Sequence, residues 1–260
     1  MAEVVVVDDA EAAGSLVARH IAARLEQQPA LVLGVATGST PLPVYAALAD
    51  LANQGLDLSS VTALALDEYV GLPQAHPQSY RSVVTREVVE PLGLDPAKVH
   101  VPDGDPAQIE TAGERFEQRI VDSGGVDVQI LGIGTGGHIA FNEPGSSFGS
   151  LTRVKTLTEQ TRRDNARFFD SVDDVPIHSV TQGLGTILRA RHLILLAFGE
   201  SKAAALAASV EGPVTASMPG SAIQLHHHVT VVVDHAAASE LRERDYYAWA
   251  QLNKPAWQGI

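Results

Sequence analysis

The sequence contains no cysteine. This excludes disulfides, thiolate catalysis, cysteine-ligated zinc and iron–sulfur clusters. Basic residues are also few: 18 lysines and arginines stand against 31 aspartates and glutamates, giving a formal net charge of −13 at pH 7. Because an acidic surface repels nucleic acid and anionic lipid, we expect neither as a partner. No apolar run approaches the roughly 18 residues that a membrane span requires.

The N-terminus lacks the features of a secretory leader, because it is acidic and has no basic segment. We therefore expect a cytoplasmic protein. What is present is ordinary globular composition, with 45% hydrophobic and 19% charged residues in a chain of 260. That length and composition are typical of a single α/β domain spanning residues 1–260.

Short apolar segments rich in Val, Ile and Leu recur along the chain, separated by helical patterns. Near-continuous apolar runs are typical of strands buried on both faces of a parallel sheet. The predicted strands are residues 4–7, 30–35, 61–66, 126–133, 192–198 and 229–233. The alternation predicts an α/β fold, a three-layer α/β/α sandwich with a doubly wound, mostly parallel, Rossmann-like sheet. Ligands of such folds bind at the carboxyl ends of the strands.

Capping residues place the starts of two helices. Apolar residues recur every four positions from Val17 to Leu25, after two aspartates at positions 8 and 9. Asp105 and Pro106 form a cap and first turn before a second apolar stripe. Both patterns are typical of helix N-termini.

The loop after the second predicted strand has the small residues of an anion site. It reads GVATGSTP and leads into a helical pattern at residues 42–51. Glycine lets backbone N–H groups approach a phosphate, the hydroxyls donate hydrogen bonds, and the helix adds the positive end of its dipole. The candidate phosphate-binding residues are Thr37, Gly38, Ser39 and Thr40. Since neither a P-loop nor a GxGxxG motif is present, a plain strand–helix turn is the alternative.

Two adjacent carboxylates, Asp67 and Glu68, end the third predicted strand. Neighbouring side chains on an extended chain point in opposite directions, so only one of the two needs to enter a cleft. Partial burial would raise the pKa of that carboxyl and suit it to act as a general base. The alternative is a helix or turn cap. Ser79, in the loop that follows, is positioned to cap the next helix.

The glycine-rich loop after the fourth predicted strand carries the clearest catalytic pattern. His138 and Glu143 lie five residues apart in it. Imidazole transfers protons near neutral pH, and a carboxylate fixes its tautomer and raises its basicity. The alternative is a buried histidine hydrogen-bonded to the backbone.

Two cations are placed to reach the same edge of the sheet. Lys202 follows the predicted strand at residues 192–198, and Arg167 lies in a predicted helix over residues 161–169. Together with backbone N–H groups, these side chains would bind a phosphate inside an otherwise acidic protein.

Two other clusters are assigned no ligand. The three histidines at residues 226–228 begin a strand and have no carboxylate or cysteine at metal-ligand spacing, so no metal site is predicted. Tyr246, Tyr247, Trp249 and Trp257 form an aromatic cluster near the C-terminus. We expect this cluster to cover a sheet edge or a subunit contact rather than to bind a ligand.

Taken together, these loops resemble those of the glucosamine-6-phosphate deaminase family. The motifs read LGVATGSTPLPVY at residues 33–45, LDEYVGLPQAHPQSY at 66–80, GHIAFNEPGSSF at 137–148 and RVKTLTEQTRRDNARFF at 153–169. The likeness continues through VTQGLGTIL at residues 180–188 and GESK at 199–202, to about residue 241. The related 6-phosphogluconolactonases share the fold and a GHxA-like signature but lack the FNEP continuation and the DEYVGL loop.

The resemblance implies conversion of D-glucosamine 6-phosphate and water into D-fructose 6-phosphate and ammonia, in amino-sugar catabolism and without a metal or organic cofactor. Asp67 matches the family's general base, which moves the C2 proton to C1 through an enolamine-type intermediate. His138 matches the residue that opens the pyranose ring, and Glu143 matches its carboxylate partner. The implied phosphate ligands are residues 37–40, Arg167 and Lys202.

Gly136 departs from the family pattern, in which many members have Asp, and some have Asn, two residues before the histidine. That Asp is understood to complete the ring-opening relay with the histidine and the glutamate. Glycine offers no side-chain acceptor, so we predict activity with reduced turnover. Three explanations are open: water replaces the carboxylate, Glu143 suffices alone, or ring opening is impaired and the chain is a weak enzyme or a sugar-phosphate sensor.

The family also includes hexamers activated by N-acetylglucosamine 6-phosphate, as well as smaller assemblies without that control. Ser146, Arg153 and Lys155 match positions of the allosteric phosphate site. An effector site and a homo-oligomer are therefore further expectations. A different sugar-phosphate enzyme, such as a 6-phosphogluconolactonase, is the second enzymatic interpretation, and Asp67 with the FNEP segment argues against it.

Overall fold

Seven parallel strands form the centre of the computed structural model, which describes residues 2–255 and 258–260. They are β1 (Glu3–Val7), β2 (Val32–Val35), β3 (Thr62–Ala65), β5 (Val99–His100), β6 (Val128–Gly132), β9 (His192–Ala197) and β10 (Val229–Asp234). Their order across the sheet is β1-β10-β9-β6-β2-β3-β5, and each pairing is parallel. The predicted doubly wound α/β fold is confirmed.

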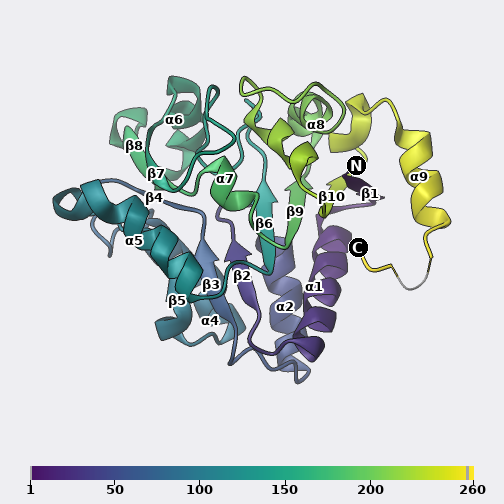
Figure 1. Ribbon diagram of the computed structural model, residues 1–260, viewed down its shortest axis with the longest axis horizontal. Coiled ribbons are helices and arrows are strands. Elements are labelled where there is room, and N and C mark those ends of the chain that lie inside the picture. The colour runs from purple at the N-terminus through teal and green to yellow at the C-terminus, as the bar shows by residue number, and fades with distance from the viewer. Residues whose placement is uncertain (1, 256–257) are drawn as a thin grey trace.

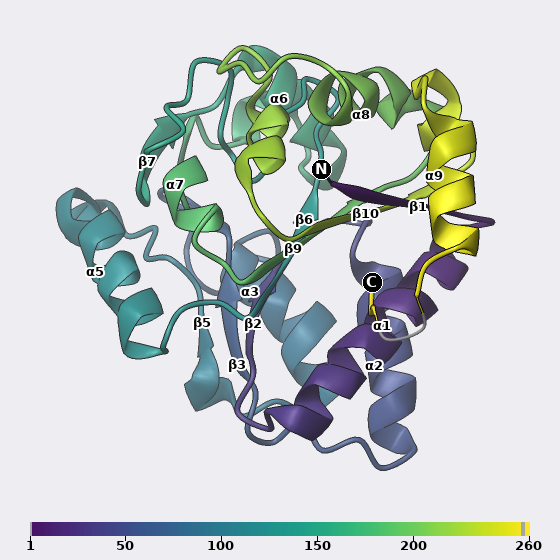
Figure 2. The same ribbon diagram turned by 45° about the vertical axis from the view of Figure 1, so that its right-hand side comes forward.

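Helices cover both faces of this sheet (Figure 1). In Figure 2, α1 (Ala10–Gln27) and α2 (Leu42–Asn53) lie on one side of it, and α5 (Ile109–Asp122) and α7 (Leu184–Ile187) lie on the other. The other helices are α3 (Tyr80–Val84), α4 (Glu90–Leu92), α6 (Glu159–Asn165), α8 (Ala203–Val210) and α9 (Arg244–Leu252). Within the described residues, none of these helices has the length and apolar character to cross a membrane.

Helix α1 begins where the sequence predicts. The Asp9 side chain accepts a hydrogen bond from the Ala12 N–H at 2.7 Å and so satisfies one of the free donors of the first turn. The face that α1 buries includes Val17, Ile21 and Leu25. The four-residue apolar spacing therefore identifies the side of the helix that packs on the sheet.

Two other predicted caps are also present. Asp105 accepts a hydrogen bond from the Ala107 N–H at 2.9 Å, in the 3₁₀ turn that leads into α5. Ser79 accepts one from the Ser82 N–H at 3.2 Å, at the start of α3. Both caps fix where a surface loop becomes a helix.

A second, smaller sheet is not predicted by the sequence patterns. β4 (Asp67–Tyr69), β8 (His178–Thr181) and β7 (Arg153–Thr156) pair in antiparallel fashion in the order β4-β8-β7. Figure 1 shows these strands beside α6, above α5. They have three or four residues each, most of them polar, so they resemble loop sequence. Strand β5, with two residues, is missed for the same reason.

Predicted element ends differ by a few residues from those observed. The clearest case is the helix predicted over residues 161–169: α6 ends at Asn165, and Ala166–Phe168 continue as a 3₁₀ turn. Arg167 therefore lies on this tighter turn rather than on an α-helix.

The C-terminal helix α9 packs against β1, the edge strand of the main sheet. The Tyr247 ring is buried, and its hydroxyl donates a hydrogen bond to Glu211 at 3.0 Å. Tyr246 and Trp249 are exposed. The aromatic segment thus covers a sheet edge, one of the two roles expected for it; Trp257 lies outside the described residues.

Candidate active site

A cavity of about 340 Å³ opens at the carboxyl ends of the parallel strands, between β2 and β6. From β2 the chain continues to β3 and β5 on one side, and from β6 it continues to β9 and β10 on the other. The strand order therefore reverses at this point, which is where ligands bind in sheets of this kind.

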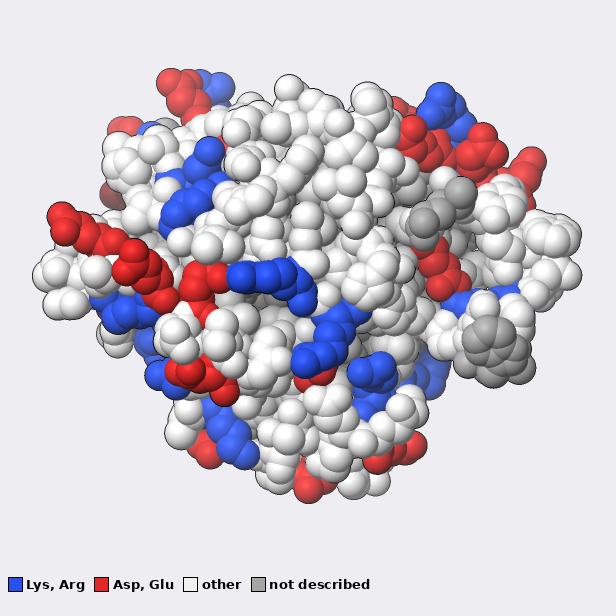
Figure 3. Space-filling view, in the orientation of Figure 1, with Lys and Arg blue, Asp and Glu red and all other residues white. Residues whose placement is uncertain are grey.

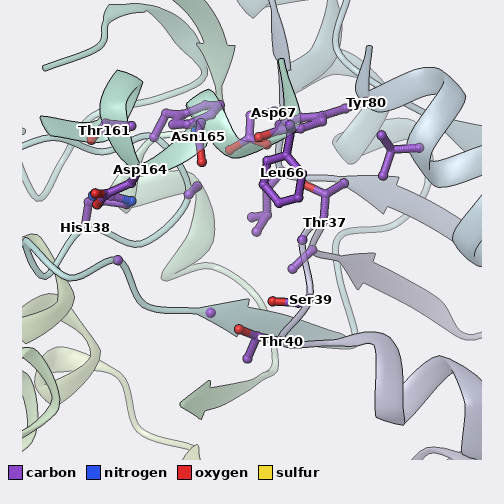
Figure 4. A pocket seen from close by; sticks show the side chains of 18 of the residues that line it. Thr37, Ser39, Thr40, Leu66, Asp67, Tyr80, His138, Thr161, Asp164 and Asn165 are labelled. Carbon is purple, nitrogen blue, oxygen red and sulfur yellow. The ribbon is translucent and has the colours of Figure 1, made fainter. Parts of the chain in front are cut away.

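Most of the predicted site residues share this cavity (Figure 4). Those that line it are Thr37, Gly38, Ser39, Thr40, Asp67, His138, Arg167 and Lys202. Glu143 lies next to His138 but is not part of the lining. Ser146, Arg153 and Lys155 are not part of it either.

Asp67 is buried, with 6% of its surface exposed, where the chain passes from the main sheet to the small one. Strand β4 pairs it with Thr181 of β8. Burial and the neighbouring charge of Glu68 raise the pKa of the Asp67 carboxyl to about 8. The Phe141 N–H and the Thr181 hydroxyl oppose this shift because they stabilise the charged form. A carboxyl with this pKa can take up and return a proton near neutral pH.

Glu68 points away from the cavity, as expected for the neighbour of Asp67 on an extended chain. Its carboxylate accepts hydrogen bonds from the backbone N–H groups of Tyr69 and Tyr80, both at 2.8 Å, and of Arg81 at 3.0 Å. These bonds satisfy donors at the start of α3. Glu68 therefore caps a helix, whereas Asp67 enters the cavity. Each of the two interpretations of the acidic pair holds for one of its residues.

Glycines bring the loop after β6 into contact with the His138 ring. A side-chain carbon on Gly134 would collide with that ring. Gly137 has a φ of +77°, in the left-handed region that favours glycine. The loop closes through hydrogen bonds from the Gly134 N–H to the His138 carbonyl and from the Gly137 N–H to the Gly134 carbonyl, both at 2.9 Å. The backbone thereby fixes His138 at the cavity wall.

The predicted carboxylate partner of His138 lies beside it. The distance from Nδ1 of His138 to Oε2 of Glu143 is 3.8 Å. The other oxygen of Glu143 accepts hydrogen bonds from the N–H and the hydroxyl of Thr158, at 2.9 and 3.3 Å. Glu143 is 3% exposed. Glu143 therefore connects the glycine-rich loop, which carries His138, to Thr158, the N-cap of α6.

Charged neighbours act on His138 in opposite directions. Burial lowers the pKa of its imidazole, and the Lys202 ammonium lowers it further. The carboxylates of Glu143 and Asp164 raise this pKa in part, but the net direction is downward. The imidazole is therefore neutral near pH 7, with one nitrogen free to accept a proton.

The loop over residues 36–41 leads into the N-terminus of α2. The Tyr45 hydroxyl anchors this loop, since it donates to the Ala36 carbonyl at 2.8 Å and accepts from the Ala36 N–H at 3.1 Å. Gly38 has a φ of +87°. The N-cap residue of α2, Pro41, makes no side-chain hydrogen bond to the helix. The positive end of α2 is thus left available to an anion.

Lys202 and Arg167 approach the cavity from two different 3₁₀ turns. Burial and the nearby Arg167 guanidinium lower the pKa of the Lys202 ammonium, so the two positive charges lie close together. The turn that carries Lys202 is fixed by Asp234, whose two carboxylate oxygens accept the Gly199 N–H at 2.9 and 3.1 Å. Two convergent cations beside a helix N-terminus can bind a phosphate.

Sequence reasoning did not single out several residues of the cavity. The Tyr80 ring stacks on Phe141, with centroids 5.9 Å apart. Asn165 donates to the Tyr69 hydroxyl at 3.0 Å, and Asp164 faces the histidine loop. All of them lie within or directly beside the motifs quoted above, but their residue types alone do not indicate a role.

Two of the three residues of the expected effector site, Ser146 and Arg153, are in direct contact. Arg153 donates to the Asn142 side-chain oxygen at 2.9 Å and to the Ser146 hydroxyl at 3.2 Å. Ser146 in turn donates to the Glu143 carbonyl at 2.7 Å. The hydrogen bonds of Ser146 and Arg153 therefore hold the chain on both sides of Glu143 in place. Lys155 lies on the same strand as Arg153, two residues further on.

Within the described part of the chain, no group of three or more His, Asp or Glu side chains is arranged to hold a metal ion. The histidine tract before β10 makes backbone contacts instead. The two ring nitrogens of His226 lie 2.9 Å from the His228 carbonyl and 2.7 Å from the Ala190 carbonyl.

The surface charge follows the acidic composition without a dominant basic area on the face shown in Figure 3. There, lysine and arginine side chains are scattered among acidic and uncharged ones. The candidate phosphate site therefore depends on local cations and not on the overall field of the protein.

Residues 8–232 match the model of the family described as glucosamine-6-phosphate isomerases/6-phosphogluconolactonase. A glucosamine-6-phosphate deaminase from Streptomyces coelicolor is 59% identical over 260 residues, covering 99% of this chain and all of the relative. One from Bifidobacterium longum is 54% identical over 272 residues and covers both chains completely.

Solved structures agree with these sequence matches. A structure described as a monomeric glucosamine-6-phosphate deaminase superposes with a TM-score of 0.89 at 40% identity, covering 92% of this chain and 99% of that one. The 6-phosphogluconolactonase of Trypanosoma brucei, at 20% identity and a TM-score of 0.73 over 93% of this chain and 99% of its own, shares the fold. By sequence and by structure, this chain belongs to the enzyme family of glucosamine-6-phosphate isomerases and 6-phosphogluconolactonases.

Proposed function

We propose that the protein converts D-glucosamine 6-phosphate and water into D-fructose 6-phosphate and ammonia. The observation that carries this proposal is the buried Asp67 carboxyl, with its pKa near 8, in one cavity with His138 and its carboxylate partner. An aldose–ketose isomerisation needs both a base at C2 and a proton shuttle at the ring oxygen. The relatives at 54–59% identity, which are named glucosamine-6-phosphate deaminases, support the same reaction.

The substrate phosphate occupies the end of the cavity formed by the loop at residues 37–40 and the N-terminus of α2. Arg167 and Lys202 supply the countercharge. Binding the phosphate at this end places the sugar carbons in the remaining space of the cavity, between Asp67 and His138. Orientation of this kind makes the proton transfers that follow effectively intramolecular.

His138 opens the pyranose ring. Its neutral imidazole takes the proton of the anomeric hydroxyl and returns it to the ring oxygen as the C1–O5 bond breaks. Glu143, 3.8 Å away, stabilises the imidazolium that forms between these two transfers.

Asp67 then transfers a proton within the open-chain sugar. Its carboxylate removes the C2 proton, and the electron pair forms a C1–C2 double bond while the C1 carbonyl bond opens onto its oxygen, which takes a proton from the C2 ammonium, giving an enolamine. Return of the proton to C1 leaves a C2 iminium, and addition of water to C2 followed by loss of ammonia gives the ketose phosphate. Each step is a proton transfer or an addition of water, so side chains suffice and no metal or organic cofactor is required.

The partner of the protein is thus a small amino-sugar phosphate. We also propose that residues 1–260 act as one domain, that the protein works in the cytoplasm, and that copies associate into a homo-oligomer. The alternative to a homo-oligomer is a monomer, because the solved relative with a TM-score of 0.89 is described as monomeric.

The first test is to incubate the purified protein with glucosamine 6-phosphate, without added metal, and to measure both products. We expect fructose 6-phosphate and ammonia in equal amounts. A 6-phosphogluconolactone substrate, run in parallel, should not be hydrolysed above the uncatalysed rate. Lactone hydrolysis without ammonia release would favour the lactonase. If neither reaction occurs but the sugar phosphate raises the Tm, the sensor interpretation replaces the enzyme.

Asp67→Asn should lower kcat by about 10²–10⁴-fold, because the amide cannot accept the C2 proton. In the parent enzyme, kcat/KM should rise with pH and level off above about pH 8, where the Asp67 carboxyl is ionised. A pH profile that is flat between 6 and 9 would contradict the assignment of Asp67 as the base. Asp50→Asn, at an exposed site on α2, is the matched control and should retain full activity.

The same substitution should also change stability, with a sign that follows from the raised pKa. The folded protein holds the Asp67 proton more tightly than the unfolded chain, so Asp67 favours folding below about pH 4 and loses that contribution as pH rises through about 8. Because asparagine does not ionise, the Asp67→Asn variant does not lose this stability as the pH rises. We therefore expect the variant to have a higher Tm than the parent at pH 8, measured by thermal unfolding.

Gly136→Asp should raise kcat, by up to about 10²-fold, if a carboxylate at this position completes the ring-opening relay. The substitution should fold normally, since a side-chain carbon at Gly136 meets no atom within 4 Å and the backbone φ is outside the left-handed region. Gly136→Asn is the control of equal size without the charge. An unchanged or lower rate in a folded Gly136→Asp variant would remove the relay explanation.

The expected effector site is a further proposal. We expect N-acetylglucosamine 6-phosphate to raise activity at low substrate concentration, through contacts of its phosphate with Ser146, Arg153 and Lys155. Lys155→Ala should abolish the response while leaving the basal rate unchanged, because Lys155 lies outside the cavity lining. A hyperbolic rate curve that does not respond to the acetylated sugar phosphate would rule this control out.

A further inference from the structure

Asp164 lies near the C-terminal end of α6 and lines the same cavity as His138. Its two oxygens are held separately. Oδ2 accepts a hydrogen bond from the Thr135 hydroxyl at 2.8 Å, and Oδ1 accepts one from the Gln160 side-chain amide at 2.8 Å. This carboxylate is thus fixed against the glycine-rich loop by one bond from that loop and one from its own helix.

Residues 134–137 of the glycine-rich loop supply no charge to this part of the cavity. Gly134, Gly136 and Gly137 have no side chains, and the Thr135 hydroxyl is used to bind Asp164. A side-chain carbon at Gly136 would find no atom within 4 Å, so the loop leaves open space there. Figure 4 shows Asp164 approaching the His138 side of the cavity from α6.

Three charged side chains act on the His138 imidazole, and they come from three different elements. Glu143 follows it on the same loop, Lys202 lies on the turn after β9, and Asp164 lies on α6. Lys202 opposes a positive charge on the ring, whereas the two carboxylates favour it. Because Glu143 is 3.8 Å away and shares its charge with Thr158, a second carboxylate has a clear electrostatic role.

We propose that Asp164 is a positioning residue for His138, which supplies from α6 the negative charge that residues 134–137 of the glycine-rich loop lack. In doing so it stabilises the imidazolium formed during ring opening and holds α6 against the loop through Thr135. This inference rests on the proposed ring-opening role of His138. It explains how a loop with glycine at position 136 can support the reaction.

The test is Asp164→Asn in the full-length protein. The amide can still accept the Thr135 hydrogen bond, but it carries no charge. We expect kcat to fall about tenfold, the change that corresponds to one pKa unit, with KM nearly unchanged. The lower of the two acidic limbs of the kcat profile, which belongs to His138 and lies below the Asp67 limb near pH 8, should move to lower pH, because the imidazolium has lost a stabilising charge. An unchanged pH limb in a folded variant would overturn the proposal.

One control variant separates charge from structure. Gln160→Ala removes the other hydrogen bond of Asp164 but keeps the carboxylate. It should leave the pH limb where it is. If Gln160→Ala moves the limb as far as Asp164→Asn does, the effect comes from altered α6 packing, and the electrostatic role is wrong.

A double-mutant cycle with Gly136→Asp gives the sharpest test. A carboxylate placed on the loop should take over the role of Asp164, so Asp164→Asn should cost several-fold less in that background than in the parent. Fully additive effects would mean that the two carboxylates do not act on the same group, and would overturn the proposal.

The inference can fail independently of the proposed function. The titration of the His138 ring can be followed by NMR in the parent and in Asp164→Asn, without substrate. We expect the His138 pKa to be lower in the variant. If the parent releases no ammonia but this shift is present, the proposed function is wrong and the electrostatic contact is supported. If the parent is active and the shift is absent, the inference alone is overturned.

Discussion

The burial of Asp67, which has no cationic partner among the residues that the structure describes, is the constraint on which the site depends. The charge that acts most strongly on its carboxyl is that of Glu68, which has the same sign. Such a carboxyl retains its proton to unusually high pH, and this makes it a base of useful strength once ionised. Two polar neighbours, the Phe141 N–H and the Thr181 hydroxyl, reduce the free-energy cost of ionising the buried Asp67 carboxyl. The small sheet brings Thr181 to Asp67, because β4 pairs with β8 at these two residues, and the Phe141 N–H donates to the Thr181 hydroxyl at 3.1 Å.

The small sheet therefore does more than cover the main one. Its central strand, β8, lies between β4, which carries Asp67, and β7, which carries Arg153. Arg153 bonds to Asn142 and Ser146 on either side of Glu143. One three-stranded unit thus fixes both Asp67, the proposed base, and the Glu143 segment beside His138, the proposed proton shuttle. A change in the pairing of β7 with β8 would be transmitted to Glu143 through Arg153.

The sequence predicts the main sheet well, because six of its strands are apolar runs buried on both faces. It also predicts which loops meet, since the carboxyl ends of parallel strands lie at one edge. The contacts among distant residues are not predictable from spacing. Asp164 and Thr135 lie 29 positions apart, and nothing in either local pattern indicates their hydrogen bond. Likewise, the small sheet is missed because β7 and β8 have four residues each and mixed polarity.

The charges around the cavity form a balance that the phosphate of a substrate would disturb. A dianion bound near Asp67 and His138 favours the protonated form of both, which would inactivate the base. Arg167 and Lys202 line the same cavity and carry the opposite charge. Their proposed role therefore extends beyond affinity, because by neutralising the phosphate they would prevent a further rise in the pKa of Asp67 in the complex. Burial lowers the pKa of the His138 imidazole. The ring therefore stays neutral while the cavity holds two cations and an anion. In the proposed mechanism, phosphate binding and proton transfer are thus coupled through electrostatics, although different loops of the chain carry them out.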